Sequence, residues 1–224
     1  MSEATHIVAI DGPAGAGKSS TAKRVAEVLG YSFLDTGAMY RAATWWAVQQ
    51  GIDLDAGDAL AESTRAMQLD IEETPKGQRV LVNGNDVTDA IRTPEITRII
   101  YKLDQNPAVR RHLVALQQRI GAQRPCVAEG RDIGTVVFPK AHCKIYMDAS
   151  LDERTNRRAR QLEEKGTPVD YPALRAEIAE RDEKAMNRAD SPLRPADDAV
   201  ILDTTQLTFD EVVDAVVRLA RQHP

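Results

Sequence analysis

The chain has 224 residues, of which 42% are hydrophobic and 28% are charged, and its formal net charge is −5. This length can bury the core of one α/β domain, and the composition is ordinary for a globular protein. The acidic balance argues against sequence-independent binding to nucleic acid, which depends on basic surface, so we expect no nucleic-acid partner.

The two cysteines, Cys126 and Cys143, each lie in an apolar run and do not form a CxxC pair. We expect both to be reduced core residues. The sequence shows no signal peptide and no apolar run of about 18 residues that would predict a membrane span. We therefore expect a cytoplasmic monomer with no membrane partner.

Short apolar runs alternate with helical patterns along most of the chain. Strands are expected at 6–10, 31–35, 125–130, 142–148 and 199–203, with helices at 19–29 and 38–50. Gly30 is placed to end the first of these helices. The alternation predicts an α/β fold with a mostly parallel sheet flanked by helices.

Residues 63–93 depart from this rhythm. Val80 and Val82 alternate with other residues, and turn signals stand at Pro75–Gly77 and Asn83–Asn85. This pattern predicts small antiparallel strands that form an insertion beside the main sheet.

A phosphate-binding motif follows the first predicted strand. The stretch GPAGAGKS fits GxxxxGK[ST] at every fixed position and precedes a predicted helix. Its glycines let backbone N–H groups curl around phosphate oxygens, and the helix N-terminus adds partial positive charge. Lys18 is placed to neutralise β- and γ-phosphate oxygens, and the Ser19 hydroxyl to ligate Mg²⁺. The expected ATP-binding residues are Gly12, Pro13, Ala14, Gly15, Ala16, Gly17, Lys18, Ser19 and Ser20.

The motif alone does not identify the phosphoryl acceptor. A GTPase should carry an Asn-Lys-x-Asp signature after a strand, and the sequence contains none. An ATP-driven motor should carry an apolar strand that ends in Asp-Glu, which is also missing. These two classes are therefore disfavoured.

Arginines at predicted element ends indicate a second anion site. The candidates are Arg41, Arg110, Arg131, Arg181 and Arg188. Arg131 comes just after the strand expected at 125–130, where ligands of parallel sheets bind. Arg181 and Arg188 are seven residues apart on a predicted helix and so share a face. Arginine forks match phosphate oxygens, although each arginine taken singly, apart from Arg131, is better explained as a solvated member of a surface ion pair.

If the second anion is a nucleotide phosphate that accepts the phosphoryl group, the reaction needs no general base. A nucleotide phosphate is largely dianionic near neutral pH and is already a nucleophile, so catalysis reduces to positioning and charge neutralisation. The histidines show no catalytic partner pattern, which agrees with this chemistry.

The Arg- and Glu-rich stretch 152–165, which ends before Gly166, predicts an exposed helix. Arg154, Arg157 and Arg158 have i, i+3, i+4 spacing and share a face. The helix is either a solvated surface element or a mobile lid that closes arginines over the transferring phosphoryl group and excludes water.

Five stretches together resemble the bacterial cytidylate kinase family: IDGPAGAGKSS, FLDTGAMYR, VNGNDVTDAIRTPEI, AEGRDIGTVVFP and RADSPLRPADDAVILDTT. The resemblance covers nearly the whole chain. It implies a single P-loop kinase domain, 1–224, and transfer of the ATP γ-phosphate to CMP or dCMP, giving CDP or dCDP and ADP. Within that domain it implies a core (about 1–62, 103–150 and 167–224), a small mixed α/β monophosphate-binding insertion (about 63–102) and a short helical lid (about 151–166).

The resemblance also implies residue roles. The residues expected to bind CMP are Thr36, Arg41, Arg110, Arg131, Asp132, Arg181 and Arg188, and those expected to be catalytic are Lys18, Asp35, Arg131 and Arg158. Asp132 resembles a cytosine reader, since a carboxylate can accept from the exocyclic amine that distinguishes cytosine from uracil. Asp35 resembles a residue that holds Mg²⁺ through water, and Arg158 resembles a lid arginine.

Two positions depart from the family pattern. Tyr101 stands where the family commonly has Ser, and Ala185 where it commonly has Asp near the ribose hydroxyls. Losing a carboxylate that accepts from a sugar hydroxyl costs roughly 1.5–3 kcal/mol of acceptor binding unless another group, such as Asp182, replaces it.

Two alternatives stay open at this point. One is a P-loop kinase for another nucleotide or small acceptor. The other is an ATP-binding sensor without turnover, against which the acceptor-side arginines argue.

Overall fold

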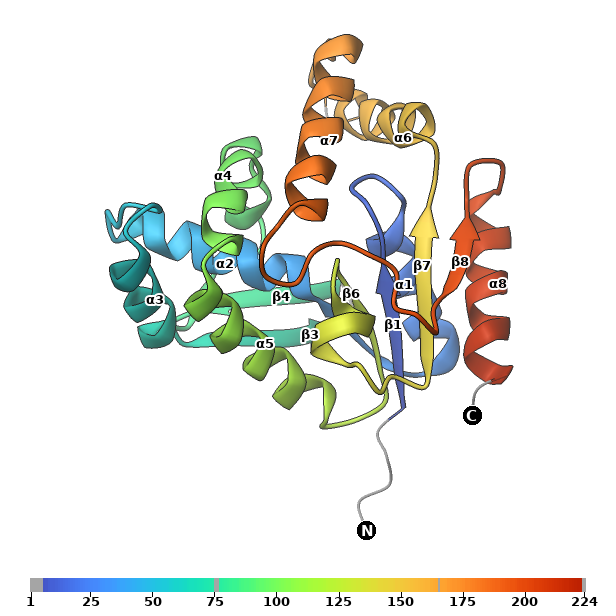
Figure 1. Cartoon of the computed structure of the whole chain (residues 1–224), viewed down its shortest axis with the longest axis horizontal. Helices are drawn as coiled ribbons and strands as arrows, with labels where there is room; N and C mark the ends of the chain where they lie inside the picture. The colour runs from blue at the N-terminus through green and yellow to red at the C-terminus, as the bar shows by residue number, and fades with distance from the viewer. Residues whose placement is uncertain (1–5, 75–76, 165, 223–224) are drawn as a thin grey trace. The chain divides into compact units, whose positions relative to one another are not determined.

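The computed structural model describes residues 6–74, 77–164 and 166–222 (Figure 1). The chain divides into two compact units. Unit 1 comprises Met1–Leu34 and Gly121–Pro224, and unit 2 comprises Asp35–Ile120.

Unit 1 is built on a five-stranded sheet with the strand order β2-β6-β1-β7-β8. Its elements are β1 (Ile7–Asp11), α1 (Lys18–Leu29), β2 (Ser32–Asp35, which ends at the border of the unit), β6 (Cys126–Glu129), the π-helical turn η2 (Ile133–Val137), β7 (Cys143–Asp148), α6 (Leu151–Glu163), α7 (Tyr171–Met186), β8 (Val200–Asp203) and α8 (Phe209–Gln222). Strand β1 pairs in parallel with β6 and β7, and β7 pairs in parallel with β8. The predicted parallel sheet is thus confirmed.

Side chains of the central strands alternate between two faces of the sheet. Val8 and Ile10 of β1 pack with Ile145 and Met147 of β7 in a core that also contains buried residues of α1 and α8. The intervening residues face the other way, because successive strand side chains point to opposite faces. Asp11 lies on this second face at the carboxyl end of β1, next to the phosphate loop.

Several elements and features predicted for unit 1 agree with the observed ones. Gly30 ends α1 in the left-handed conformation, with φ of 70°. Cys126 and Cys143 are buried and free, as expected. The strands expected at 125–130, 142–148 and 199–203 are β6, β7 and β8.

Unit 2 contains helices and a three-stranded antiparallel sheet in the order β3-β4-β5. Its elements are α2 (Thr36–Gln49), α3 (Gly57–Ala66), β3 (Leu69–Thr74), β4 (Gly77–Val82), β5 (Asn85–Asp86), the short 3₁₀ helix η1 (Ala90–Arg92), α4 (Pro94–Asp104) and α5 (Pro107–Gly121). The predicted small antiparallel strands are confirmed, although residues 63–66 belong to α3.

Two turns had been expected in this small sheet. At the second, Asn83 and Gly84 both have positive φ, 49° and 78°, which is the geometry of a tight two-residue hairpin. At the first, Pro75 and Lys76 lie outside the described residues.

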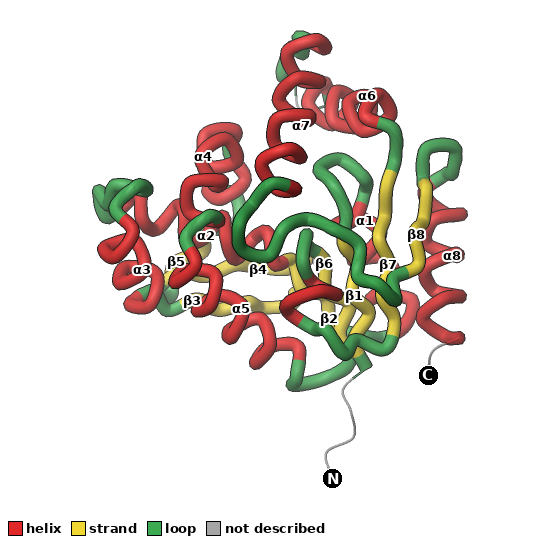
Figure 2. Tube along the Cα trace, in the orientation of Figure 1, coloured by secondary structure: helices red, strands yellow, loops and turns green. Residues whose placement is uncertain are grey.

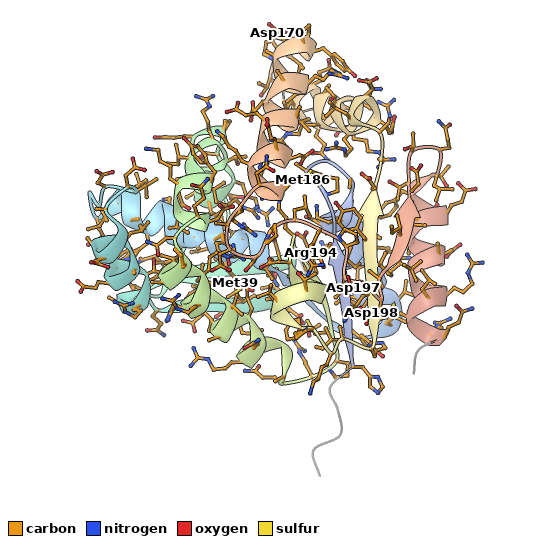
Figure 3. The ribbon with its side chains drawn as sticks, in the orientation of Figure 1. Met39, Asp170, Met186, Arg194, Asp197 and Asp198 are labelled. Atoms are coloured by element: carbon orange, nitrogen blue, oxygen red, sulfur yellow. The ribbon has the colours of Figure 1, made fainter. Side chains whose placement is uncertain are left out.

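The region from α6 to β8 differs from the prediction in two respects. Helix α6 forms as predicted, but it is not exposed all round, since Arg154, Thr155 and Ala159 are buried. Helix α7 runs from just after Asp170 to Met186 (Figure 3), and Asn187 caps it. Arg188 therefore lies beyond the helix, and the expectation that it shares a helical face with Arg181 is wrong.

The Arg188 side chain forms hydrogen bonds with backbone carbonyls just after the end of α7. The Arg188 Nε donates to the Asp190 carbonyl at 2.7 Å, and its guanidinium also donates to the Ser191 carbonyl. Ser191 has φ of 53°, so the chain has left the helical path before Pro192. Figure 2 shows the irregular loop that follows and leads to β8.

None of the helices within the described ranges 6–74, 77–164 and 166–222 is long and apolar enough to cross a membrane.

Candidate active site

The phosphate loop joins β1 to α1. Gly12 has φ of +146°, and a Cβ placed there would lie 2.0 Å from the carbonyl oxygen of Met147 in β7. Only glycine lets the backbone pass this close to the neighbouring strand. Gly17, with φ of 90°, then sets the start of α1. The loop therefore delivers the N-terminus of α1 to the carboxyl edge of the sheet, where helix partial charge favours an anion.

The polar side chains of the loop have partners within unit 1. Lys18 Nζ donates to the Pro13 carbonyl at 2.7 Å, and Ser20 Oγ donates to the Gly17 carbonyl at 2.9 Å. Ser19 Oγ donates to Glu129 Oε1 at 2.6 Å. The motif serine thus touches a carboxylate at the end of β6.

Helices α6 and α7 bind the backbone N–H and carbonyl of one loop residue, Ala14. The Ala14 N–H donates to Asp182 Oδ1 at 3.0 Å, and the Ala14 carbonyl accepts from Arg154 Nη1 at 2.9 Å. Arg154 and Asp182 also form an ion pair with each other. A Cβ at Gly15 would lie 3.0 Å from the Arg154 carbonyl oxygen, so α6 packs directly on the loop.

The other arginines of α6 differ from Arg154 in their contacts. Arg157 Nη2 donates to the Thr204 carbonyl at 2.6 Å, and its Nη1 reaches the Ala16 carbonyl at 3.3 Å. Arg158 Nη1 donates to Gln161 Oε1 at 3.4 Å, within the helix itself. Among these three arginines, Arg154 and Arg157 donate to backbone carbonyls of the phosphate loop, whereas the described hydrogen bond of Arg158 stays within α6.

Cationic side chains gather around Lys18 in unit 1. Burial lowers the pKa of Lys18 to about 8; Glu129 raises that pKa, and the charges of Arg131 and Arg181 lower it further. A positive charge can depress the pKa of a lysine only when it is near. Lys18 therefore lies near Arg131 and Arg181, with the carboxylates of Glu129 and Asp11 as counter-charges.

Two further predicted acceptor residues in unit 1 are buried. Asp132, directly after Arg131, is 5% exposed, and Arg188 is 8% exposed. The guanidinium of Arg188 is held by backbone carbonyls of the loop after α7 rather than by α7 itself.

In unit 2 the predicted site residues surround the start of α2. Asp35 accepts from the Ala38 N–H at 2.7 Å and caps the helix, and it also pairs with Arg41 at 2.9 Å and with Arg92 at 3.4 Å. Thr36, the first residue of α2, is buried. Asp35 therefore stabilises the start of α2 and pairs with two arginines, in addition to its expected role near Mg²⁺.

Arg110 lies in the same unit and is 2% exposed. Its guanidinium carbon sits 5.4 Å from the ring centre of Tyr40, and its Nη1 reaches the Asp104 carbonyl at 3.3 Å. Tyr101, on α4, is partly exposed. Stacking on Tyr40 holds the Arg110 guanidinium plane, which is how an arginine is prepared for an anion.

Position 185 is apolar in its surroundings as well as in its side chain. Ala185 is 5% exposed and packs with Tyr146 and Leu193. Asp182, the candidate replacement for the family carboxylate, is committed to Ala14 and Arg154 instead.

Two carboxylates beside the phosphate loop, Glu129 and Asp11, had not been predicted as site residues. Each is the last residue of a buried strand, and each is about 5% exposed or less. A carboxylate at the carboxyl end of a strand, next to Gly12 or Gly130, was the available signal.

Comparison with known proteins identifies the family. The family model described as cytidylate kinase matches residues 8–222. The chain belongs to the cytidylate kinase family. A cytidylate kinase from Solibacter usitatus (strain Ellin6076) is 48% identical over 217 residues, which cover 96% of this chain and 92% of that protein.

Other relatives are larger. A bifunctional pantoate ligase/cytidylate kinase from Synechococcus sp. (strain JA-3-3Ab) is 48% identical over 219 residues, and the match covers 96% of this chain but only 41% of that protein. Among solved structures, an uncharacterised protein from Eubacterium ventriosum ATCC 27560 matches with a TM-score of 0.52 and 10% identity over 96% of this chain and 98% of that one. This last likeness concerns the fold alone.

Proposed function

We propose that this chain transfers the γ-phosphate of ATP to CMP or dCMP, giving ADP and CDP or dCDP. Membership of the cytidylate kinase family supports the reaction. The observation that carries the two-phosphate reading is the electrostatic grouping of Arg131 and Arg181 with Lys18. A site that only held ATP would need the lysine and the loop amides, whereas a second anion explains the added arginines.

On the donor side, the loop Gly12–Ser20 binds the ATP phosphates through its N–H groups and the N-terminus of α1. Lys18 neutralises β- and γ-phosphate oxygens. In place of the Pro13 carbonyl, phosphate oxygens become acceptors for its ammonium group. This assignment uses the same residues that the motif predicts.

Magnesium fits the oxygen groups beside Ser19. The Ser19 hydroxyl and the buried Glu129 carboxylate lie 2.6 Å apart, and Mg²⁺ is usually held by one or two such protein oxygens, with phosphates and waters completing its shell. Within the described residues, no cluster of three or more His, Cys, Asp or Glu side chains could hold a metal by itself. Ser19 and Glu129 would hold the ion, with Asp35 acting through water, and the ion would neutralise charge on the β- and γ-phosphates.

On the acceptor side, an oxygen of the CMP phosphate attacks the γ-phosphorus. The bond between that phosphorus and the bridging oxygen breaks, and ADP leaves with the electron pair. No proton has to be removed from the acceptor, so the work of the protein is to place two phosphates and neutralise them. The acceptor residues we propose are Thr36, Arg41, Arg110, Arg131, Asp132, Arg181 and Arg188.

Asp132 is the proposed cytosine reader. It is buried, it follows a phosphate-side arginine, and its carboxylate can accept from the exocyclic amine of cytosine. Uracil presents an oxygen at the same place, which would oppose the carboxylate.

The division of the chain into core, insertion and lid is part of this proposal. Arg158 is the proposed lid arginine, since its described hydrogen bond stays within α6, at Gln161, and leaves the phosphate loop to the other two arginines. Arg154 and Arg157 instead support the phosphate loop. We further propose that the protein acts as a monomer in the cytoplasm, as expected of an enzyme whose substrates are free nucleotides.

The test is ADP formation with a panel of nucleoside monophosphates, each measured as kcat/KM at fixed ATP and Mg²⁺. We expect kcat/KM for CMP and dCMP to exceed that for AMP, GMP and UMP by at least about tenfold, because one base-specific hydrogen bond can provide discrimination of this size. If another nucleotide exceeds CMP tenfold, the acceptor assignment is wrong. If ATP binds but no acceptor stimulates ADP release, the chain is a nucleotide sensor.

A further inference from the structure

Asp11 is a buried carboxylate to which the proposed mechanism gives no role. It is the last residue of β1 and directly precedes Gly12, the first residue of the phosphate loop. It is 4% exposed. A buried carboxylate is expensive to keep in a protein interior unless its oxygens have donors.

The hydrogen-bond donors are two consecutive N–H groups in the segment 131–134, which follows β6 and is called the acceptor loop below because Arg131 and Asp132 are proposed to bind the acceptor. Ile133 N–H donates to Asp11 Oδ1 at 2.7 Å, and Gly134 N–H donates to Asp11 Oδ2 at 2.7 Å. Each carboxylate oxygen therefore binds one amide, which fixes the position and the tilt of the peptide that follows Asp132. These amides open the π-helical turn η2, whose first residue comes directly after Asp132.

The turn is also pressed against the carboxylate. A Cβ at Gly134 would lie 3.3 Å from Asp11 Oδ2 and 3.2 Å from the Lys144 side chain. Lys144 Nζ itself donates to both oxygens of Asp198 at 2.9 Å. Gly134 thus packs against both Asp11 and Lys144, whose side chains project from the same face of the sheet, because Ala9 is the register partner of Lys144 and Asp11 is two residues further along β1.

Charged residues of the proposed donor and acceptor groups also lie near Asp11. Burial raises the pKa of Asp11 to about 7, the amides of Gly134 and Ile133 lower it, and the charges of Asp132 and Lys18 act on it in opposite directions. The charges of Asp132, the proposed base reader, and of Lys18, in the phosphate loop, are therefore both near Asp11.

We propose that Asp11 is a positioning residue for the phosphoryl acceptor: its carboxylate holds the Ile133–Gly134 amides so that Asp132 and Arg131 meet the base and the phosphate of the nucleotide. This role rests on the proposed function. It also gives the protein a direct mechanical link between the donor loop, which begins at Gly12, and the acceptor loop.

The first variant is Asp11→Asn, which keeps the shape but turns one acceptor oxygen into an NH₂ group that faces an N–H donor. We expect its KM for CMP to rise about tenfold and its CMP-over-UMP ratio of kcat/KM to fall at least about fivefold, because small displacements of binding groups have large kinetic effects. KM for ATP should stay within about twofold, since the loop amides and Lys18 are kept.

The second variant is Gly134→Ala, which approaches the same contact from the loop side without changing a charge. The added methyl group forces the turn or its neighbours to shift by a few tenths of an ångström. A rise of about two- to fivefold in KM for CMP is expected, again without a matching change for ATP. The control is Asp214→Asn, at an exposed position of α8, which should leave the CMP-over-UMP ratio unchanged.

Hydrogen exchange of the Ile133 and Gly134 amides supplies a readout that does not depend on turnover, and we expect it to accelerate in Asp11→Asn. The inference is overturned if folded Asp11→Asn keeps its KM for CMP and its CMP-over-UMP ratio, or if KM for ATP rises as much as KM for CMP. Should Asp11→Asn fail to fold, unchanged acceptor kinetics in Gly134→Ala would overturn it instead. If the wild-type chain uses another nucleotide, the proposed function fails, and the same variants test Asp11 with that acceptor.

Discussion

The two halves of the proposed site are built in different ways. The donor loop is one contiguous segment, Gly12–Ser20, and the helices α6 and α7 of the same unit support it through Ala14. The proposed acceptor residues come from separate segments of the chain. A contiguous loop can be recognised from its own spacing, whereas a dispersed set becomes visible only through the family pattern and the fold.

The largest expected effect concerns the support of the donor loop. Arg154→Ala removes one partner of the buried ion pair and leaves Asp182 uncompensated. We expect a loss of about 3–5 kcal/mol in the free energy of unfolding, measured by urea denaturation. Arg160→Ala, an exposed position on the same helix, should change it by less than about 0.5 kcal/mol. Equal stability of the two variants would show that the pair does not hold the loop.

The next effect concerns donor chemistry alone. Lys18→Met should lower kcat by about 10²–10³, because a preorganised positive group at the γ-phosphate is lost. Binding of CMP, measured by calorimetry, should weaken less than turnover does. The exposed Lys23 on α1 provides the matched control, Lys23→Met, whose kcat should be normal. A near-normal kcat for Lys18→Met would remove Lys18 from the catalytic role.

A pH profile tests the role of Lys18 in ATP binding. The pKa of Lys18 is lowered to about 8, mainly by burial, so the free enzyme loses this positive charge as pH rises through 8. The value of kcat/KM for ATP should therefore fall towards a tenfold decrease per pH unit above pH 8. Lys18→Arg stays charged in this range and should not show that fall, even if its activity is lower throughout. A flat wild-type profile up to pH 10 would contradict the assignment.

The smallest effect concerns the sugar. Ala185 packs against Tyr146 and Leu193, and Asp182 is engaged elsewhere. With no carboxylate supplied from this part of α7, CMP and dCMP should be used with kcat/KM values within about threefold of each other. A preference for CMP of more than tenfold would mean that another group reads the 2′-hydroxyl.

Prediction from sequence succeeded where the signal was local. The periodicity of apolar residues located β1, β6, β7 and β8, and glycine spacing located the phosphate loop. Prediction failed for contacts between residues that are far apart in the chain. No pattern in the sequence indicates that Arg154 pairs with Asp182 or that Ser19 bonds to Glu129. Arg188 was misplaced because its own side chain binds the carbonyls that follow α7.

The comparison also predicts how the halves fail. Damage to the donor loop should slow transfer to every acceptor alike, whereas damage to the acceptor loop should change which nucleotide is chosen. Asp132 is the residue at which this difference should be sharpest, because it is buried next to the amides that Asp11 holds and is proposed to contact only the acceptor.

The most direct measurement is therefore the ratio of kcat/KM for CMP to that for UMP in Asp132→Ala and in the wild-type chain, with KM for ATP measured in parallel. We expect the ratio to fall at least about tenfold in the variant, with KM for ATP within about twofold and an unchanged melting temperature. An unchanged ratio in a folded variant would contradict the account, because cytosine would then be recognised elsewhere.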